Sequence, residues 1–372
     1  MKFISSKNKN ERIPIWAIAL LCLAAVSVII LLIARNNIAF ALFFDKYISG
    51  AVRRILAFLT NFIPFSLAEL LIIFLPIIIT ILIIYAVKRK SDSLRAIFSY
   101  FVSLLAAASV IFSLFVFSFG VGYHVPSLYD RFDISKDGVS ADQLRVTAIK
   151  LATKANALSE QVDYTSDGFS RMPYSLSQMN DKLIGTYKQI REKYSFVQDF
   201  SSNIKPVLMS VPMSYTHTTG VYTFFTGEAN LNVDFPDYSL PYTTAHELAH
   251  QRGISRENEA NFIAFLVCIN TDDVYIQYSA YVNMFEYVAA ALYYADADMY
   301  NQVYSKLSDS VKGELAAYSK FYDKYRDSKA GEVSSAINNA YLVANGTAEG
   351  TKSYGLVVDL TVAYFEGKFD EK

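Results

Sequence analysis

The chain has 372 residues, of which 53% are hydrophobic, and its mean hydropathy of +0.23 is high for a soluble protein. Its net charge of −1 is the sum of two opposite parts: residues 1–119 carry +8 and residues 120–372 carry −9. The acidic part has scattered basic residues, which excludes a nucleic-acid-binding surface. The chain has two cysteines, Cys22 in the basic part and Cys268 in the acidic part, which excludes a disulfide framework.

Three long apolar runs lie in the basic part, at about residues 13–34, 67–87 and 96–119. Each approaches or exceeds the roughly 20 residues of helix that cross a bilayer. A buried core helix is the alternative for any one run, but three of them with basic flanks favour membrane helices. We therefore predict a three-helix membrane region over residues 1–123, with the lipid bilayer as its partner.

The first run could instead be a signal peptide, because lysines precede it and Ala39-Phe40-Ala41 has the pattern of a cleavage site. Its length favours an uncleaved anchor. Basic residues cluster in the N-terminal tail and in the Lys88–Arg95 loop, which predicts that both are cytoplasmic. The protein is then a multi-pass cell-membrane protein whose C-terminal domain is extracytoplasmic. Between the first two runs, the apolar residues from Ile48 to Leu59 favour an amphipathic interfacial helix.

Residues 124–372 are predicted to form one domain that is mainly α-helical with a small β element. Helical periodicity dominates, for example in Ser135–Val162 and Met179–Val197. Between Val207 and Asp234 the sequence changes to short β-favouring pieces broken by Gly227, which predicts a small sheet or hairpin.

A helix that Thr243 or Thr244 would cap carries His246-Glu247-x-x-His250. Histidines four residues apart share one helix face, so both imidazoles can bind one zinc ion while Glu247 remains free to act on water. Gly253 is expected to end this helix, and Ser255 to cap the next one.

A catalytic zinc site usually has three protein ligands. His124 sits at the end of a predicted span, so a carboxylate of the following helix is the better third ligand, and the two choices are Glu257 and Glu259. Glu257 is favoured because it lies in the first turn and points back towards the preceding helix. Asn261, one turn further on the same face, could support His246 or Glu257 by a hydrogen bond.

The run from His246 to Asn261 resembles the gluzincin metallopeptidases, in which a glutamate on a second helix completes the zinc site. The segments FTGEANLN, PYTTAHELAHQRG and EANF, with three predicted spans ahead of them, also resemble a family of bacterial membrane proteins known as domain of unknown function 3810. Two features depart from the zinc peptidases. Only six residues separate His250 from Glu257, and the metzincin spacing after Gly253 would place the third ligand on Arg256, which cannot bind zinc.

The predicted function is hydrolysis of peptides or envelope proteins by a membrane-anchored, zincin-like metallopeptidase, with Glu247 as the catalytic base. Candidates to stabilise the oxyanion are His217, Tyr222 and Tyr354. The segment Val221–Asn232 would be either an edge strand that binds an extended substrate or a hairpin that covers the helix. Its register decides whether Glu228 and Asn230 face the substrate.

Two other readings remain. The domain could be a non-enzymatic zinc-binding sensor or scaffold. Alternatively, the site could lie within the membrane, which the polar residues that border the motif disfavour. The sequence does not indicate an oligomeric state.

Overall fold

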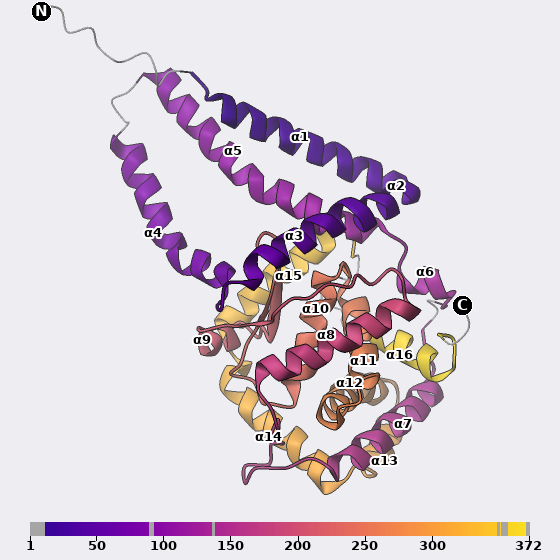
Figure 1. Ribbon diagram of the computed structural model, residues 1–372. Coiled ribbons are helices and arrows are strands. Elements are labelled where there is room, and N and C mark those ends of the chain that lie inside the picture. Colours follow the sequence, from indigo (N-terminus) through magenta and orange to yellow (C-terminus); the bar gives the residue numbers. More distant parts are fainter. Residues whose placement is uncertain (1–11, 89–92, 136–137, 348–349, 351–355, 370–372) are drawn as a thin grey trace, which may run out of the picture.

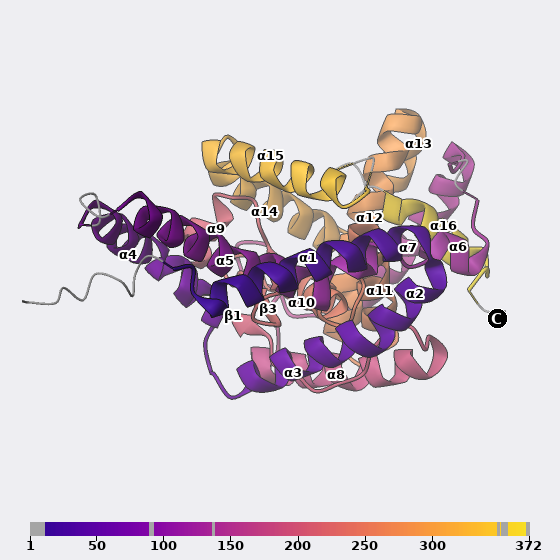
Figure 2. The ribbon, with the colours of Figure 1, turned by 90° about the horizontal axis from the view of Figure 1, so that it is seen from above.

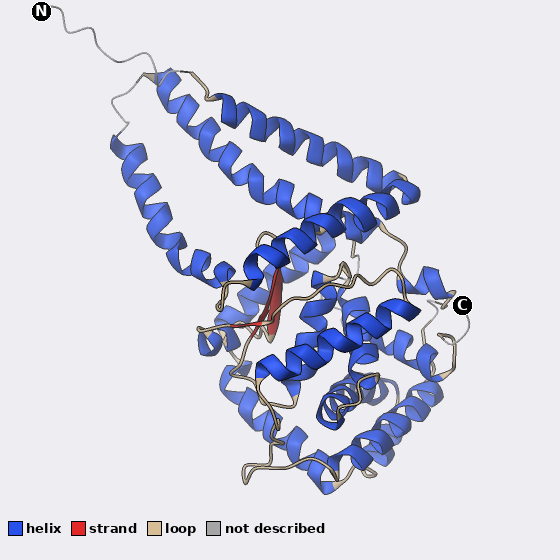
Figure 3. Cartoon of the chain, viewed as in Figure 1, coloured by secondary structure: helices blue, strands red, loops and turns tan. Residues whose placement is uncertain are grey.

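The computed structural model describes residues 12–88, 93–135, 138–347, 350 and 356–369. Three long helices project from one side of a helical domain, and a small sheet lies on the side of the domain that faces them (Figures 1 and 3). The prediction of a mainly α fold with a small β element is confirmed.

The three projecting helices are α1 (Ile15–Asn36), α4 (Leu67–Lys88) and α5 (Leu94–Ser118). Each is long and apolar enough to cross a membrane, as the sequence predicted. Helices α1 and α5 pack side by side, whereas α4 diverges from them towards the domain (Figure 1). The apolar side chains of α4 are exposed on every face, from Leu70 through Val87.

A helical segment crosses between α1 and α4, over the face of the domain (Figure 1). It comprises α2 (Ile38–Phe43), the π-helical η2 (Phe44–Ser49) and α3 (Gly50–Asn61). Ile55 and Leu59 of α3 are more than half exposed, while Arg53 on its other face is fully buried. This amphipathic character agrees with the expected interfacial helix.

The domain is built around one large apolar core to which α7, α8, α10, α11, α12 and α16 contribute. Capping boxes at Ser140 and Ser175 begin two of these helices. Seen from above, α10 and α11 lie between a side with α3 and α8 and a side with α14 and α15 (Figure 2). The helices that follow α5 are η3 (Gly120–His124), α6 (Leu128–Phe132), α7 (Ala141–Ser159), α8 (Leu176–Lys193), α9 (Ser210–Ser214), α10 (Ser239–Gln251), α11 (Glu257–Ile269), α12 (Val274–Ala295), α13 (Ala297–Tyr304), α14 (Asp309–Arg326), α15 (Lys329–Ala344) and α16 (Val357–Phe365).

The sheet has three short strands in the order β1 (Lys205–Pro206), β3 (Glu228–Leu231), β2 (Gly220–Thr223). β1 runs parallel to β3, and β2 pairs with β3 antiparallel, with Val221 opposite Asn230. β2 is therefore an edge strand. The side-chain amide of Asn230 donates to the carbonyl of Val221, 3.0 Å away, so this side chain stabilises the pairing of β2 with β3.

Buried Arg53 joins α3 to both α5 and the domain. Its guanidinium donates to the side chain of Asp45 at 3.0 Å, to the carbonyl of Ser118 at 2.8 Å and to Gln198 at 3.4 Å. A buried cation is tolerated only when it is paired and hydrogen-bonded in this way. This network therefore fixes the C-terminal end of α5 against the domain.

Two carboxylates connect the start of α4 to the domain, one from each side of the contact. Glu228 of β3 accepts the free N–H groups of Leu67 and Ala68, at 3.0 and 2.9 Å, which places a negative charge at the helix N-terminus. Glu69 of α4 in turn accepts the N–H groups of Leu208 and Met209 in the domain. Glu228 is thus a structural residue rather than one that faces a substrate.

Candidate functional site

The turn between α10 and α11 brings the two predicted ligand helices together. Gly253 has a φ of +101°, which favours glycine, and ends α10 as predicted. A Cβ at this position would lie 2.6 Å from the Arg53 guanidinium. The turn consequently needs glycine for its backbone and for the close approach of α3.

Two cap predictions are wrong. Helix α10 begins at Ser239 rather than at Thr243 or Thr244, because Pro241 fits within a first helical turn. Ser255 does not cap α11: Arg256 holds the N-cap position, and the Ser255 hydroxyl donates to the carbonyl of Phe119 at 3.2 Å. This bond connects the turn to the end of α5.

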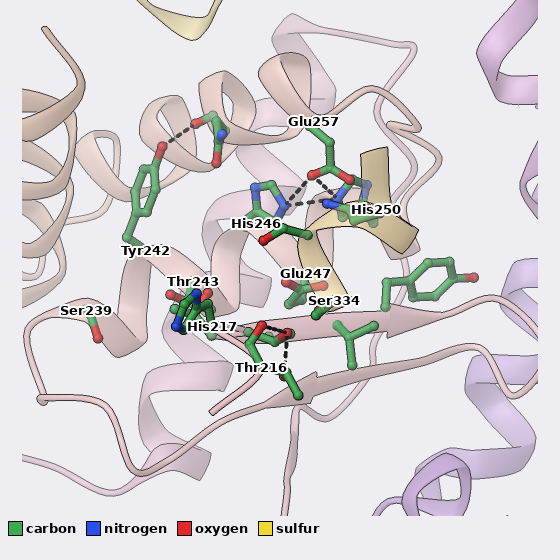
Figure 4. Close-up of a pocket in the computed structure, with 18 of the residues that line it drawn as sticks. Thr216, His217, Ser239, Tyr242, Thr243, His246, Glu247, His250, Glu257 and Ser334 are labelled. Carbon is green, nitrogen blue, oxygen red and sulfur yellow. Dashed lines mark hydrogen bonds and ion pairs between the residues drawn. The ribbon is translucent and has the colours of Figure 1, made fainter. Parts of the chain in front are cut away.

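Three side chains from these helices converge in one cluster (Figure 4). The Nε2 atoms of His246 and His250 are 3.0 Å apart, and Oε2 of Glu257 lies 3.2 Å and 3.3 Å from them. Ligands at zinc distances of 2.0–2.1 Å in a tetrahedron are about 3.3 Å apart. The spacing of these three potential ligand atoms is therefore compatible with one zinc ion.

The orientation of His250 is fixed from its outer side. Its Nδ1 lies 2.7 Å from the carbonyl of Ile254, which can only accept, so Nδ1 carries a proton and Nε2 points into the cluster. This arrangement is typical of a metal-binding histidine. Burial lowers the pKa of His250, but the charge of Glu257 and its hydrogen bond raise it to about 9 overall. Burial raises the pKa of Glu257, yet both histidines lower it by more.

Glu247 lies between this cluster and the edge strand β2 (Figure 4). The N–H of Tyr222 donates to its carboxylate. Burial raises the pKa of Glu247, and the two histidines partly offset that effect. A carboxylate with a raised pKa next to a potential metal site is suited to accept and return a proton.

Gly220 provides the space that Glu247 occupies. A Cβ at residue 220 would lie 2.7 Å from both Cγ and Oε1 of Glu247, closer than real contacts allow. We predict that Gly220→Ala displaces the Glu247 carboxylate. For the zinc-dependent hydrolysis that the sequence predicts, a misplacement of about 1 Å should lower kcat about 100-fold without a change in zinc content. The matched control is Gly185→Ala at an exposed position of α8, where the added methyl meets nothing within 4 Å. Steady-state kinetics with metal analysis check this, and full activity of Gly220→Ala would contradict it.

The alternative third ligand, Glu259, lies elsewhere. Its Oε1 accepts the N–H of Leu128 at 2.9 Å and the guanidinium of Arg256 at 3.4 Å. It thus stabilises the start of α6. Asn261 lines the cavity beside the cluster, and its backbone carbonyl accepts the hydroxyl of Tyr242 at 3.0 Å. Among the described residues, no hydrogen bond joins Asn261 to His246 or Glu257.

The three oxyanion candidates have different surroundings. His217 lies in the cavity wall, but its Nε2 donates to the carbonyl of Tyr325 at 2.7 Å. The ring of Tyr222 packs 5.5 Å from that of Phe119, and its hydroxyl is buried without a partner among the described residues. Tyr354 falls outside the described residues.

The cluster opens into a large cavity of about 1700 Å³. The cavity is lined by the Thr216–Tyr222 segment, which includes most of β2, and by residues of α10, α11, α12 and α15. Two tyrosines of this cavity, Tyr287 of α12 and Tyr341 of α15, were not singled out by sequence. Burial raises the pKa of both phenols to about 12, and the charge of Glu257 contributes to both. For Tyr287 the charge of Glu286 adds to this effect, whereas for Tyr341 the hydrogen bond with Tyr123 partly offsets it. Among 27 tyrosines, sequence offers no signal for these two.

The fold and the cluster together define a mostly helical protein with three candidate membrane helices and a partly buried histidine–glutamate cluster in its helical domain. The chain belongs to the family described as Protein of unknown function (DUF3810), whose model matches residues 44–362. The match runs from η2 into α16, so it includes α4, α5 and the whole cavity. No curated protein and no solved structure matches the chain.

Proposed function

We propose that this protein is a membrane-anchored, zinc-dependent metallopeptidase of zincin type that cleaves polypeptides outside the cytoplasm. The observation that carries the proposal is the triangle of His246, His250 and Glu257 with Glu247 beside it, at the wall of an open cavity. A structural zinc site is usually closed by four protein ligands, whereas a catalytic site keeps one position free. Three converging potential ligands with a neighbouring carboxylate therefore favour a catalytic zinc site over a structural one.

A zinc ion bound by these three residues would polarise a peptide carbonyl and bring the pKa of a water molecule to near 7. Glu247 is positioned to accept a proton from that water and to return it to the leaving amine. Its burial supports both steps, because a raised pKa brings the carboxyl closer to the working pH. The N–H of Tyr222 keeps the carboxylate oriented.

The edge strand β2 is suited to align an extended substrate. It runs along the cavity beside Glu247, and Val221 at its centre is 41% exposed. An extended peptide can add to such an edge through main-chain hydrogen bonds. This supports a polypeptide substrate rather than a small molecule, which would need no aligned edge.

Tyr341 is the phenol that we assign to oxyanion stabilisation. It lies on α15, in the same cavity as α10, and its hydroxyl is 3.4 Å from that of Tyr123. We expect Tyr341→Phe to lower kcat about 100-fold with little change in KM, since a donor that serves only the transition state is lost. Tyr318→Phe is the control, because Tyr318 also lines the cavity but packs on Tyr238 and Tyr322. Equal kinetics for both variants would exclude this role for Tyr341.

The orientation follows from charge. Basic residues of the N-terminal tail and of the loop between α4 and α5 favour a cytoplasmic position for both, which places the domain after α5 outside. Labelling of single cysteines introduced into α7 and into the α4–α5 loop, in intact cells with a membrane-impermeant reagent, tests it. If only the cysteine in the loop is labelled, the protein has the opposite orientation to the one proposed.

Metal removal tests the activity as a whole. The full-length protein, purified in detergent, is expected to contain about one zinc per chain and to cleave internally quenched peptides. A chelator should abolish cleavage, and added zinc should restore it. Zinc binding without hydrolysis of any peptide or protein would favour the rival role of a sensor or scaffold.

A further inference from the structure

The end of the third candidate membrane helix forms part of the cavity wall. Phe119, which caps α5, and Tyr123, in the η3 turn that follows, both line the cavity. The ring of Phe119 packs 5.8 Å from the imidazole of His250. The predicted ligand thus contacts the residue at which the membrane helix ends.

This wall is continuous with α5 itself. One turn before Phe119, Phe115 packs 5.2 Å from Phe224 and 6.1 Å from Tyr341, and these two rings also line the cavity. The Ser118 hydroxyl donates to the carbonyl of Phe224 at 3.1 Å. An aromatic surface therefore extends from the last turn of α5 to the metal-binding cluster.

The domain is held in this position at several points. The Arg53 network joins it to the end of α5, and the paired contacts of Glu228 and Glu69 join it to the start of α4. Apolar side chains flank this junction without protein cover: Phe58 and Phe62 of the α3 region are 61% and 74% exposed, and Leu208 is 83% exposed. Exposed apolar groups of this kind beside membrane helices favour immersion in the lipid interface.

We propose that the substrate is a membrane-anchored protein, cut just outside its own membrane span, with an apolar side chain next to the scissile bond. This rests on the proposed peptidase function. A cavity fixed at the membrane surface reaches the juxtamembrane segment of a neighbouring anchored chain, and ten extended residues cover only about 33 Å. Confinement to the bilayer also raises the effective concentration of such a substrate. The aromatic wall accounts for the apolar preference.

A distance series tests the proposal. Full-length protein is reconstituted in liposomes with a single-span substrate whose external segment repeats one apolar-containing cassette several times, and the products are mapped by mass spectrometry. We expect cleavage only in cassettes within about ten residues of the span, and at least tenfold slower cleavage of the same cassettes as a free peptide. Equal cleavage of all cassettes, or of the free peptide, overturns the proposal and leaves the peptidase function standing. If neither substrate is cut, both proposals fail.

Crosslinking gives a readout that does not depend on turnover. In the Glu247→Gln variant, a photo-crosslinking residue at Val221, in the cavity, should capture the juxtamembrane segment of the anchored substrate. The matched control site is Val146 of α7, which is 45% exposed against 41% for Val221 but does not line the cavity. Capture from both sites alike, from neither site, or equally with the free peptide contradicts the proposal.

Discussion

Replacing Glu247 with glutamine is expected to abolish peptide hydrolysis while the zinc content and the fold are kept. The two side chains have nearly the same shape, so the space beneath Gly220 remains filled. Glutamine cannot accept the proton, and loss of a general base lowers kcat by about 100- to 10,000-fold. Initial rates on a quenched peptide, metal analysis and thermal unfolding of the same preparation measure the three properties.

The control is Glu332→Gln, an exposed glutamate on α15 that does not line the cavity. Its activity should match that of the unaltered protein. A cell-based function that survives Glu247→Gln unchanged would count against catalysis as the physiological role, and would direct attention to the sensor or scaffold reading.

Glu257→Gln should weaken zinc binding, whereas Glu259→Gln should lower the stability of the fold. Glu257 contacts both histidines, so its amide variant loses a ligand, and zinc affinity should fall by more than the roughly 100-fold that loss of an outer hydrogen-bond partner can cost. Glu259 contacts Leu128 and Arg256 instead. Its variant should keep zinc and lose about 1–2 kcal/mol of unfolding free energy, because two donors lose a charged acceptor.

Competition with a chromogenic chelator measures the affinities, and chemical denaturation of each variant measures stability. Retained zinc in Glu257→Gln together with lost zinc in Glu259→Gln would reverse the assignment of the third ligand. Loss of zinc from both variants, with a folded protein, would show that the whole α10–α11 unit is needed rather than one carboxylate.

Several features could be predicted because they depend on local sequence. The three apolar helices follow from three long apolar runs with basic flanks, and the sheet from a β-favouring stretch broken at Gly227. The positive φ of Gly253 ends α10 where the glycine indicated. The spacing of His246, His250 and Glu257 also constrains geometry, because one helix turn and one tight return bring them together.

Local rules failed where a distant segment competed for the same group. Ser255 would cap α11 in an isolated peptide, but the carbonyl of Phe119, from the end of α5, takes its hydroxyl. The role of Glu228 does not follow from local sequence, because its partner is the N-terminus of a helix some 160 residues away in the chain. Tyr341 lies in the cavity only because α15 folds back towards α5.

The sequence alone thus predicted which three side chains form the cluster, since they belong to one pair of adjacent helices. The tertiary structure decided which segments of the chain surround that cluster. It placed β2 over Glu247, it put Glu259 beside α6 instead of the cluster, and it brought Phe119 against His250. These contacts join segments more than a hundred residues apart, or strands whose register no local pattern sets, so only the packed chain could define them.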